Sequence, residues 1–130
     1  MSTAAICRVA GGALVVLIGV ALAIGGVQLW RGGPTAWPNV IADARIVAQV
    51  SGGMLVMAVL MLVSGAAAIG NLPWGRWAGS SATVFLVIAA FWVNQALFGD
   101  IRPAHTVINL VVAAIIVALL RFGFAHPEAS

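Results

Sequence analysis

Six side chains that can form hydrogen bonds without carrying a fixed charge lie near the ends of long apolar stretches of this chain. They are Gln28, Gln49, Asn94, Gln95, His105 and Asn109. Amides donate and accept hydrogen bonds, and neutral histidine does the same. His105 and Asn109 are four residues apart, so they share one helical face. Side chains of these types are suited to recognising the polar part of a small molecule.

The elements that must position these residues are four apolar stretches, at about 9–30, 46–69, 77–98 and 104–122. Each is long enough to cross a bilayer, which takes about 20 residues of helix. The chain is 63% hydrophobic and 7% charged, with a mean hydropathy of +1.15, whereas soluble domains carry about 25% charged residues. We therefore predict an all-α integral membrane protein, a single antiparallel four-helix transmembrane bundle formed by residues 1–130.

The lengths of the loops agree with helices that cross the membrane in alternating directions. The connections at 71–75 and 99–103 are short, which implies antiparallel neighbours. Only the first loop, about 31–45, is long enough to have a shape of its own, and we interpret its Trp37-Pro38 pair as an anchor at the membrane interface.

Antiparallel threading gathers the polar residues at one end of the bundle, beside several aromatic residues. Two interpretations follow. In the first, the amides and His105 meet interfacial water and lipid headgroups. In the second, they line a shallow cavity that opens sideways to lipid and holds a quinone head, a lipid or another amphipathic molecule. The predicted ligand-binding residues are Gln28, Gln49, Trp92, Asn94, Gln95, His105 and Asn109.

Metal binding is not expected. The one histidine that could join His105 is His126, which the threading places at the opposite membrane face. No cysteine or carboxylate has ligand spacing with His105. Cys7 is the only cysteine, so it is interpreted as a free thiol, and no cofactor other than a quinone or lipid is expected.

Catalysis and coupled transport are also disfavoured. A catalytic group would have to combine His105 with Asp100 and a hydroxyl such as Thr106 or Thr83, and nothing in the spacing selects these residues. We therefore predict no catalytic residues and lean against an enzyme. The predicted spans contain no acidic residue, although proton-coupled transporters need an embedded ionisable group.

Small residues recur every seven positions along the first three stretches. They are Gly12, Gly19 and Gly26, then Ser51, Ala58 and Gly65, then Ala82, Ala89 and Ala96. In lipid, small residues let helices approach closely, and a seven-residue repeat favours a left-handed bundle crossing at roughly 20°. We expect these stripes to pack the helices into a compact bundle. A second face with Ala21 and Gly25 leaves a homo-oligomer open.

The charges bear on location. All six basic residues are arginines near the predicted helix ends, where they are typical of membrane interfaces. The net charge of +3 is spread over the loops, which excludes a nucleic-acid surface. The composition, with no Lys or Tyr, indicates a bacterial plasma (inner) membrane. The arginines divide three and three between the two sides, and the N-terminal amine together with Asp43 and Asp100 opposite favours cytoplasmic termini.

Three functions follow in order of preference. The first is a non-catalytic subunit or accessory (scaffold) protein that packs against a membrane partner or itself. The alternative is a binding protein for a quinone, lipid or other lipophilic molecule at the polar and aromatic end. The third is a small channel or transporter. The sequence carries no motif that assigns the chain to a family.

Overall fold

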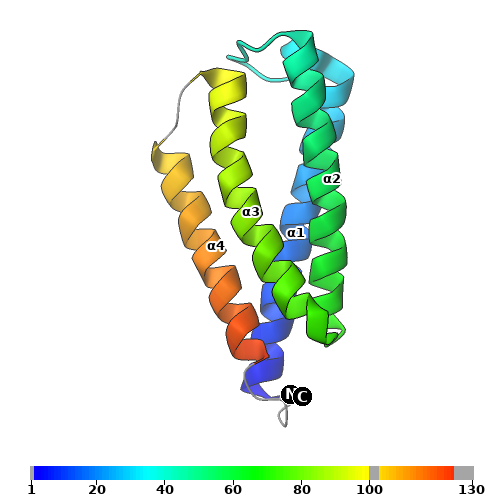
Figure 1. The fold of residues 1–130 in the computed structure, drawn as a ribbon, viewed down its shortest axis with the longest axis vertical. Helices are drawn as coiled ribbons and strands as arrows, with labels where there is room; N and C mark the ends of the chain where they lie inside the picture. Colours follow the sequence, from blue (N-terminus) through cyan, green and yellow to red (C-terminus); the bar gives the residue numbers. More distant parts are fainter. Residues whose placement is uncertain (1, 100–102, 125–130) are drawn as a thin grey trace.

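The computed structural model describes residues 2–99 and 103–124 and confirms the predicted fold class (Figure 1). Its helices run up and down in turn: α1 (Thr3–Gly32), α2 (Ala44–Ile69), α3 (Pro73–Phe98) and α4 (Pro103–Gly123), with a short 3-10 turn, η1 (Gly33–Thr35), after α1. All four helices are long and apolar enough to cross a membrane. The chain is therefore a multi-pass membrane protein.

Local chemistry explains where the helices begin. The Ser2 hydroxyl accepts a hydrogen bond from the Ala5 amide at 3.1 Å, so α1 starts at Thr3, six residues before the predicted start. The Asp43 carboxylate caps α2 by accepting from the Ile46 amide at 3.0 Å. Helix α3 starts at Pro73, inside the stretch predicted as a loop, because proline suits the first helical turn, where its missing N–H would have no partner.

Helices α1 and α2 pack most closely, along two of the predicted small-residue stripes. A Cβ atom added to Gly12 would lie 2.8 Å from the Gly65 carbonyl oxygen, and one added to Gly65 would lie 2.7 Å from the Gly12 carbonyl oxygen. Further along, a Cβ atom on Gly19 would lie 3.2 Å from the Ala58 carbonyl oxygen. The two backbones are thus nearly in contact, which only glycine or another small residue allows.

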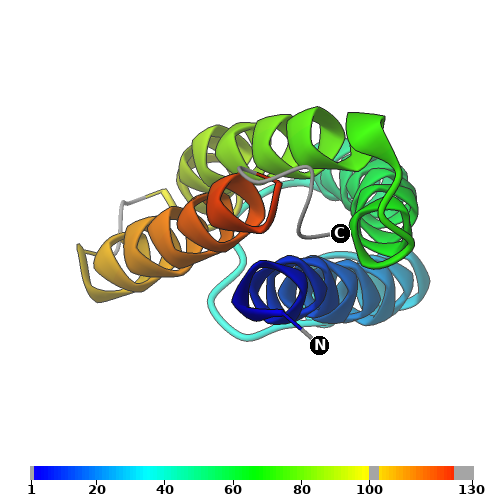
Figure 2. The same cartoon turned by 90° about the horizontal axis from the view of Figure 1, so that it is seen from below.

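The bundle is also tight at the end where α1 begins and α4 finishes (Figure 2). Leu120 of α4 is fully buried there. It lies between Gly11 of α1 and Gly79 of α3, where added Cβ atoms would be 3.1 Å and 2.8 Å from its side chain. Gly75 at the start of α3 similarly meets the backbone of Ala68. Glycines of α1 and α3 therefore close this end around Leu120, and we call it the closed end.

At the opposite end, α3 and α4 diverge from α1 and α2 (Figure 1). The expected compact bundle is thus compact over only part of its length. The third small-residue stripe shows the difference: Ala82 packs against the core near the closed end, whereas Ala89, two turns further along α3, borders a cavity. Near this open end α3 and α4 carry larger side chains, such as Trp92 and Ile108, which border the cavity and are more than half exposed.

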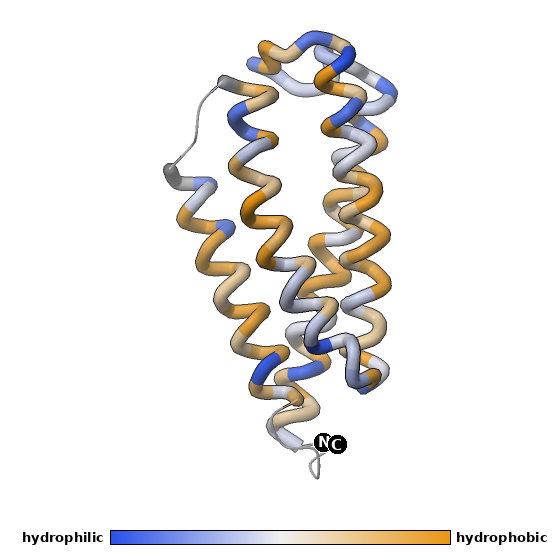
Figure 3. The backbone as a smooth tube through the Cα atoms, in the orientation of Figure 1, coloured by the Kyte–Doolittle hydropathy of each residue, from blue (hydrophilic) through white to orange (hydrophobic). Residues whose placement is uncertain are grey.

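Hydropathy changes along the bundle from the closed end to the open end (Figure 3). Polar residues occur mainly towards the two ends of the bundle, and the middle of the helices is apolar. Large apolar side chains such as Leu17 on α1, Val59 on α2, Ile88 on α3 and Val111 on α4 are exposed. Because lipid tails are as apolar as these side chains, this outer surface is suited to face the bilayer.

Candidate binding site at the open end of the bundle

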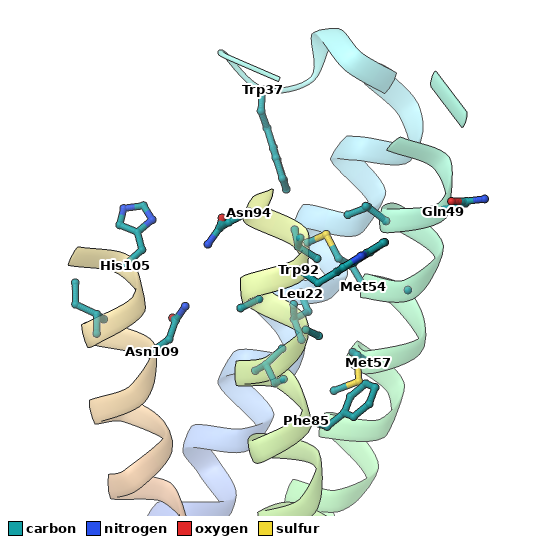
Figure 4. Close-up of a pocket in the computed structure, with 17 residues that line it drawn as sticks. Leu22, Trp37, Gln49, Met54, Met57, Phe85, Trp92, Asn94, His105 and Asn109 are labelled. Atoms are coloured by element: carbon teal, nitrogen blue, oxygen red, sulfur yellow. The ribbon is translucent and has the colours of Figure 1, made fainter. Parts of the chain in front are cut away.

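The open end contains a cavity of about 630 Å³, which lies within the range of small-molecule sites. Residues from all four helices and from the first loop line it (Figure 4). Five of the seven predicted ligand-binding residues are among them: Gln49, Trp92, Asn94, His105 and Asn109. Most of the remaining lining is apolar, including Leu22, Met54, Met57 and Phe85. The cavity thus combines an apolar wall with a few hydrogen-bonding groups.

The polar groups of α3 and α4 form one side of this cavity. Asn94 and Asn109 extend into the space between the two helices, and His105 lies one turn before Asn109 on α4 (Figure 4). Within the described part of the chain, none of these three side chains makes a hydrogen bond. Asn109 is six residues into α4, about 9 Å along the helix axis. An amide at that depth has a strong need for a partner, because unpaired polar groups are costly in apolar surroundings.

Gln49 and Trp92 border the cavity on its α2 side. Gln49 is exposed, and its amide points away from α3 (Figure 4). Trp92 is 57% exposed, so part of its ring is available to lipid. These two residues therefore form the rim of the cavity, where interfacial aromatic and amide groups are common.

The remaining two predicted residues do not line the cavity. Gln95 is exposed near the end of α3. Gln28 is connected to the cavity indirectly, because its side-chain oxygen accepts a long hydrogen bond, 3.4 Å, from the indole nitrogen of Trp37, which does line it. The structure thus separates Asn94 from Gln95, although the two amides are adjacent in sequence.

Trp37 is a lining residue that the sequence reasoning assigned to the membrane interface. It packs against a buried cluster that includes Leu29, Val50 and Leu97, and its ring extends from the loop toward the cavity (Figure 4). The loop is fixed to α3 by a hydrogen bond from the Ile41 amide to the Leu97 carbonyl oxygen at 2.8 Å. Trp37 therefore partly covers the mouth of the cavity. Its position in the only long loop was the one sequence signal for this role.

A second cavity, of about 420 Å³, lies deeper between α1, α3 and α4. The two cavities share four lining residues: Leu22, Leu86, Ala90 and Asn109. The hydroxyl of Thr83, which also borders the deeper cavity, already donates to the Gly79 carbonyl oxygen at 2.7 Å. Apart from Thr83 and Asn109, the described lining is aliphatic.

The second small-residue face considered for a homo-oligomer borders the cavities, although Ala21 itself is exposed. Ala21 lines the deeper cavity. A Cβ atom added to Gly25 would lie 3.0 Å from the Met54 methyl group and 3.5 Å from the Trp37 ring. Gly25 thus helps to shape the interior, whereas Ala21 borders the deeper cavity at an exposed position.

The described side chains define what this site can do chemically. No group of three or more metal-ligating residues occurs among them, and Cys7 is a half-buried free thiol near the closed end. Asp100 and His126, which were considered for catalysis and metal binding, lie outside the described residues, as do Arg102 and Glu128. The available chemistry is therefore hydrogen bonding by neutral amides and His105 beside an apolar wall.

Comparison with known protein families, curated proteins and solved structures gives no significant match. The residues and shape of the site itself therefore carry the evidence for function.

Proposed function

We propose that this membrane protein binds an amphipathic, lipid-soluble small molecule at the open end of the bundle. The observation that supports this most directly is the 630 Å³ cavity with Asn94, His105 and Asn109 along one side. A bound polar head would give the amides hydrogen-bond partners. The apolar wall would accommodate the hydrocarbon part of the ligand, and Trp37 would restrict its exit.

The flexible side chains in the wall also support a binding role. Met54 and Met57 lie on the side of α2 that borders the cavity. Methionine is unbranched and polarisable, so it adapts its shape to a bound molecule. Together with the half-buried Trp37, these residues provide a wall that can close around a ligand.

The test is ligand retention after gentle purification. Lipid extracts of the purified protein, analysed by mass spectrometry, should contain a defined small molecule in stoichiometric amount. Each of the variants Asn94→Leu and Asn109→Leu should weaken retention by about 2- to 13-fold, since a neutral hydrogen bond contributes about 0.5–1.5 kcal/mol. The double variant should lose the ligand.

Gln95→Leu is the matched control, because it removes an amide of the same end of α3 that does not line the cavity. It should retain the ligand as the wild type does. Equal retention by the folded Asn94→Leu, Asn109→Leu and Gln95→Leu proteins would contradict the proposal, as would a wild-type protein that carries no small molecule.

The role as a non-catalytic subunit or accessory protein remains a prediction. It relied on small-residue stripes, and Gly12, Gly19, Ala58 and Gly65 are used within the bundle, between α1 and α2. We therefore prefer the ligand-binding role to the subunit role. Native mass spectrometry separates the two, because a stoichiometric second polypeptide would support the subunit role.

A channel or transporter stays third, since the predicted spans contain no acidic residue.

We also propose a bacterial plasma membrane as the location, with the closed end at the cytoplasmic side. The support is the composition and the position of the charges: Arg8, Arg76 and Arg121 lie toward the closed end, whereas Asp43 is at the open end with Arg31 and Arg45. In this orientation the ligand site lies near the outer face of the membrane.

A further inference from the structure

We infer that the ligand has an uncharged head and a long apolar tail, and that the tail enters the second cavity between α1, α3 and α4. This inference rests on the proposed function and specifies the chemical class of the ligand. It depends on two observations: the connection between the two cavities and the absence of charged side chains from their described linings.

The cavities meet at residues that both of them share. Leu22 of α1, Leu86 and Ala90 of α3 and Asn109 of α4 line each one. From this junction the second cavity continues to Ile116, which is fully buried near the closed end. A molecule whose head lies beside Asn109 can therefore extend its tail toward the middle of the bundle. The polar-to-apolar order of the lining matches the order of groups in such a molecule.

The neutral head follows from electrostatics. Among the described residues that line the cavities there is no Asp, Glu, Lys or Arg. An ionised head beside Asn94 and Asn109 would lose its hydration without gaining an opposite charge from the described lining, which costs several kcal/mol. A hydroxyl or carbonyl head loses less and recovers its hydrogen bonds from the amides.

The tail must be selected by shape. In a bilayer, moving a hydrocarbon chain from lipid into protein removes no apolar surface from water, so the hydrophobic effect contributes little. What remains is dispersion, which depends on close contact and is lost when a wall is too near or too far. Three alanines, Ala21, Ala90 and Ala113, leave the space in the second cavity, so a larger residue at any of them should fill it.

Photocrosslinking in lipid nanodiscs tests the inference. The probes are two forms of monooleoylglycerol, one with a diazirine next to the glycerol head and one with it at the tail end, and tail-end diazirine oleic acid at pH 8. Peptide mapping should find the head label on α3 and α4 around Asn94 and Asn109. It should find the tail label on Ile18, Val112 or Ile116, which line the second cavity.

A matched pair of variants on α4 makes the result specific. Ala113 lines the second cavity, and its neighbour Ala114 is exposed on the outside of the helix. Ala113→Phe should reduce tail labelling of Ile18 and Ile116 by about tenfold, because it removes the contacts of the chain. Ala114→Phe should leave it unchanged. If Ala113→Phe fails to fold, Ala21→Leu fills the same cavity from α1 and should give the same loss.

The outcomes separate this inference from the proposed function. Head labelling at Asn94 with tail labelling only on outward residues, such as Val107 or Val111, would refute the tail position and leave ligand binding standing. Labelling by oleic acid as strong as labelling by monooleoylglycerol would refute the neutral head, because the charge should weaken it by about tenfold or more. No head labelling around Asn94 and Asn109 would refute this inference alone if the purified wild-type protein retains a small molecule, and both proposals if it retains none.

Discussion

Replacing Gly65 by alanine should separate α1 from α2 at their closest approach. The added Cβ atom would lie 2.6 Å from a methyl carbon of Val16, 2.7 Å from the Gly12 carbonyl oxygen and 3.0 Å from the Val16 amide nitrogen. Two of these three atoms belong to the backbone of α1, so a side-chain rotation cannot relieve the contact. The helices themselves must move.

The magnitude follows from these distances. Ordinary contact begins near 3.4 Å, so the 2.7 Å approach to the Gly12 oxygen requires a local separation of about 0.7 Å. A gap of about 0.5–1 Å removes a quarter to a half of the dispersion energy of each atom pair it affects. Overpacking of this kind typically costs about 1–3 kcal/mol. We therefore expect Gly65→Ala to lower the free energy of unfolding by this amount.

The assay is reversible unfolding by SDS in mixed micelles, followed by circular dichroism and tryptophan fluorescence. Gly52→Ala is the control in the same helix, because nothing lies within 4 Å of a Cβ atom at that position. It should leave stability unchanged or raise it by up to about 1 kcal/mol, the difference in helix propensity between glycine and alanine. A Gly65→Ala protein as stable as Gly52→Ala would refute the close approach of α1 and α2.

Two further predictions concern burial and threading. Leu29→Ala should lower the free energy of unfolding by about 2–3 kcal/mol, because Leu29 is fully buried. Leu17→Ala, at a 63% exposed position, should change it by less than about 0.5 kcal/mol. Equal losses in the SDS assay would contradict the packing of α1. The second prediction uses cysteines that replace Asn39 and Asn71 one at a time in a Cys7→Ser background. They should react with an impermeant maleimide from opposite sides of the membrane, with Asn39→Cys labelled from outside. Labelling of both from one side would contradict the antiparallel order of the helices.

Part of the candidate site could be predicted because it depends only on threading. Once the spans alternate in direction, Asn94 near the end of α3 and His105 and Asn109 near the start of α4 must lie at the same end. The separation of Asn94 from Gln95 could not be predicted, since both amides lie near the end of α3 and only the position of its neighbours decides which one borders the cavity. Met54 and Met57 were missed for the same reason, because an apolar lining residue looks like any other residue of an apolar helix.

The four spans, their alternating direction and the end that carries the amides were determined by the sequence itself. The physical reason is that lipid offers no hydrogen bonds, so an apolar stretch of this length must satisfy its backbone as a helix. Which helix faces approach, and how closely, was decided by tertiary structure. Helix α1 is apolar on all sides, so hydropathy cannot identify its inner face. Steric fit does so: glycines such as Gly12 and Gly65 bring α1 and α2 together, whereas α3 and α4 diverge from them at the open end, where the 630 Å³ cavity lies.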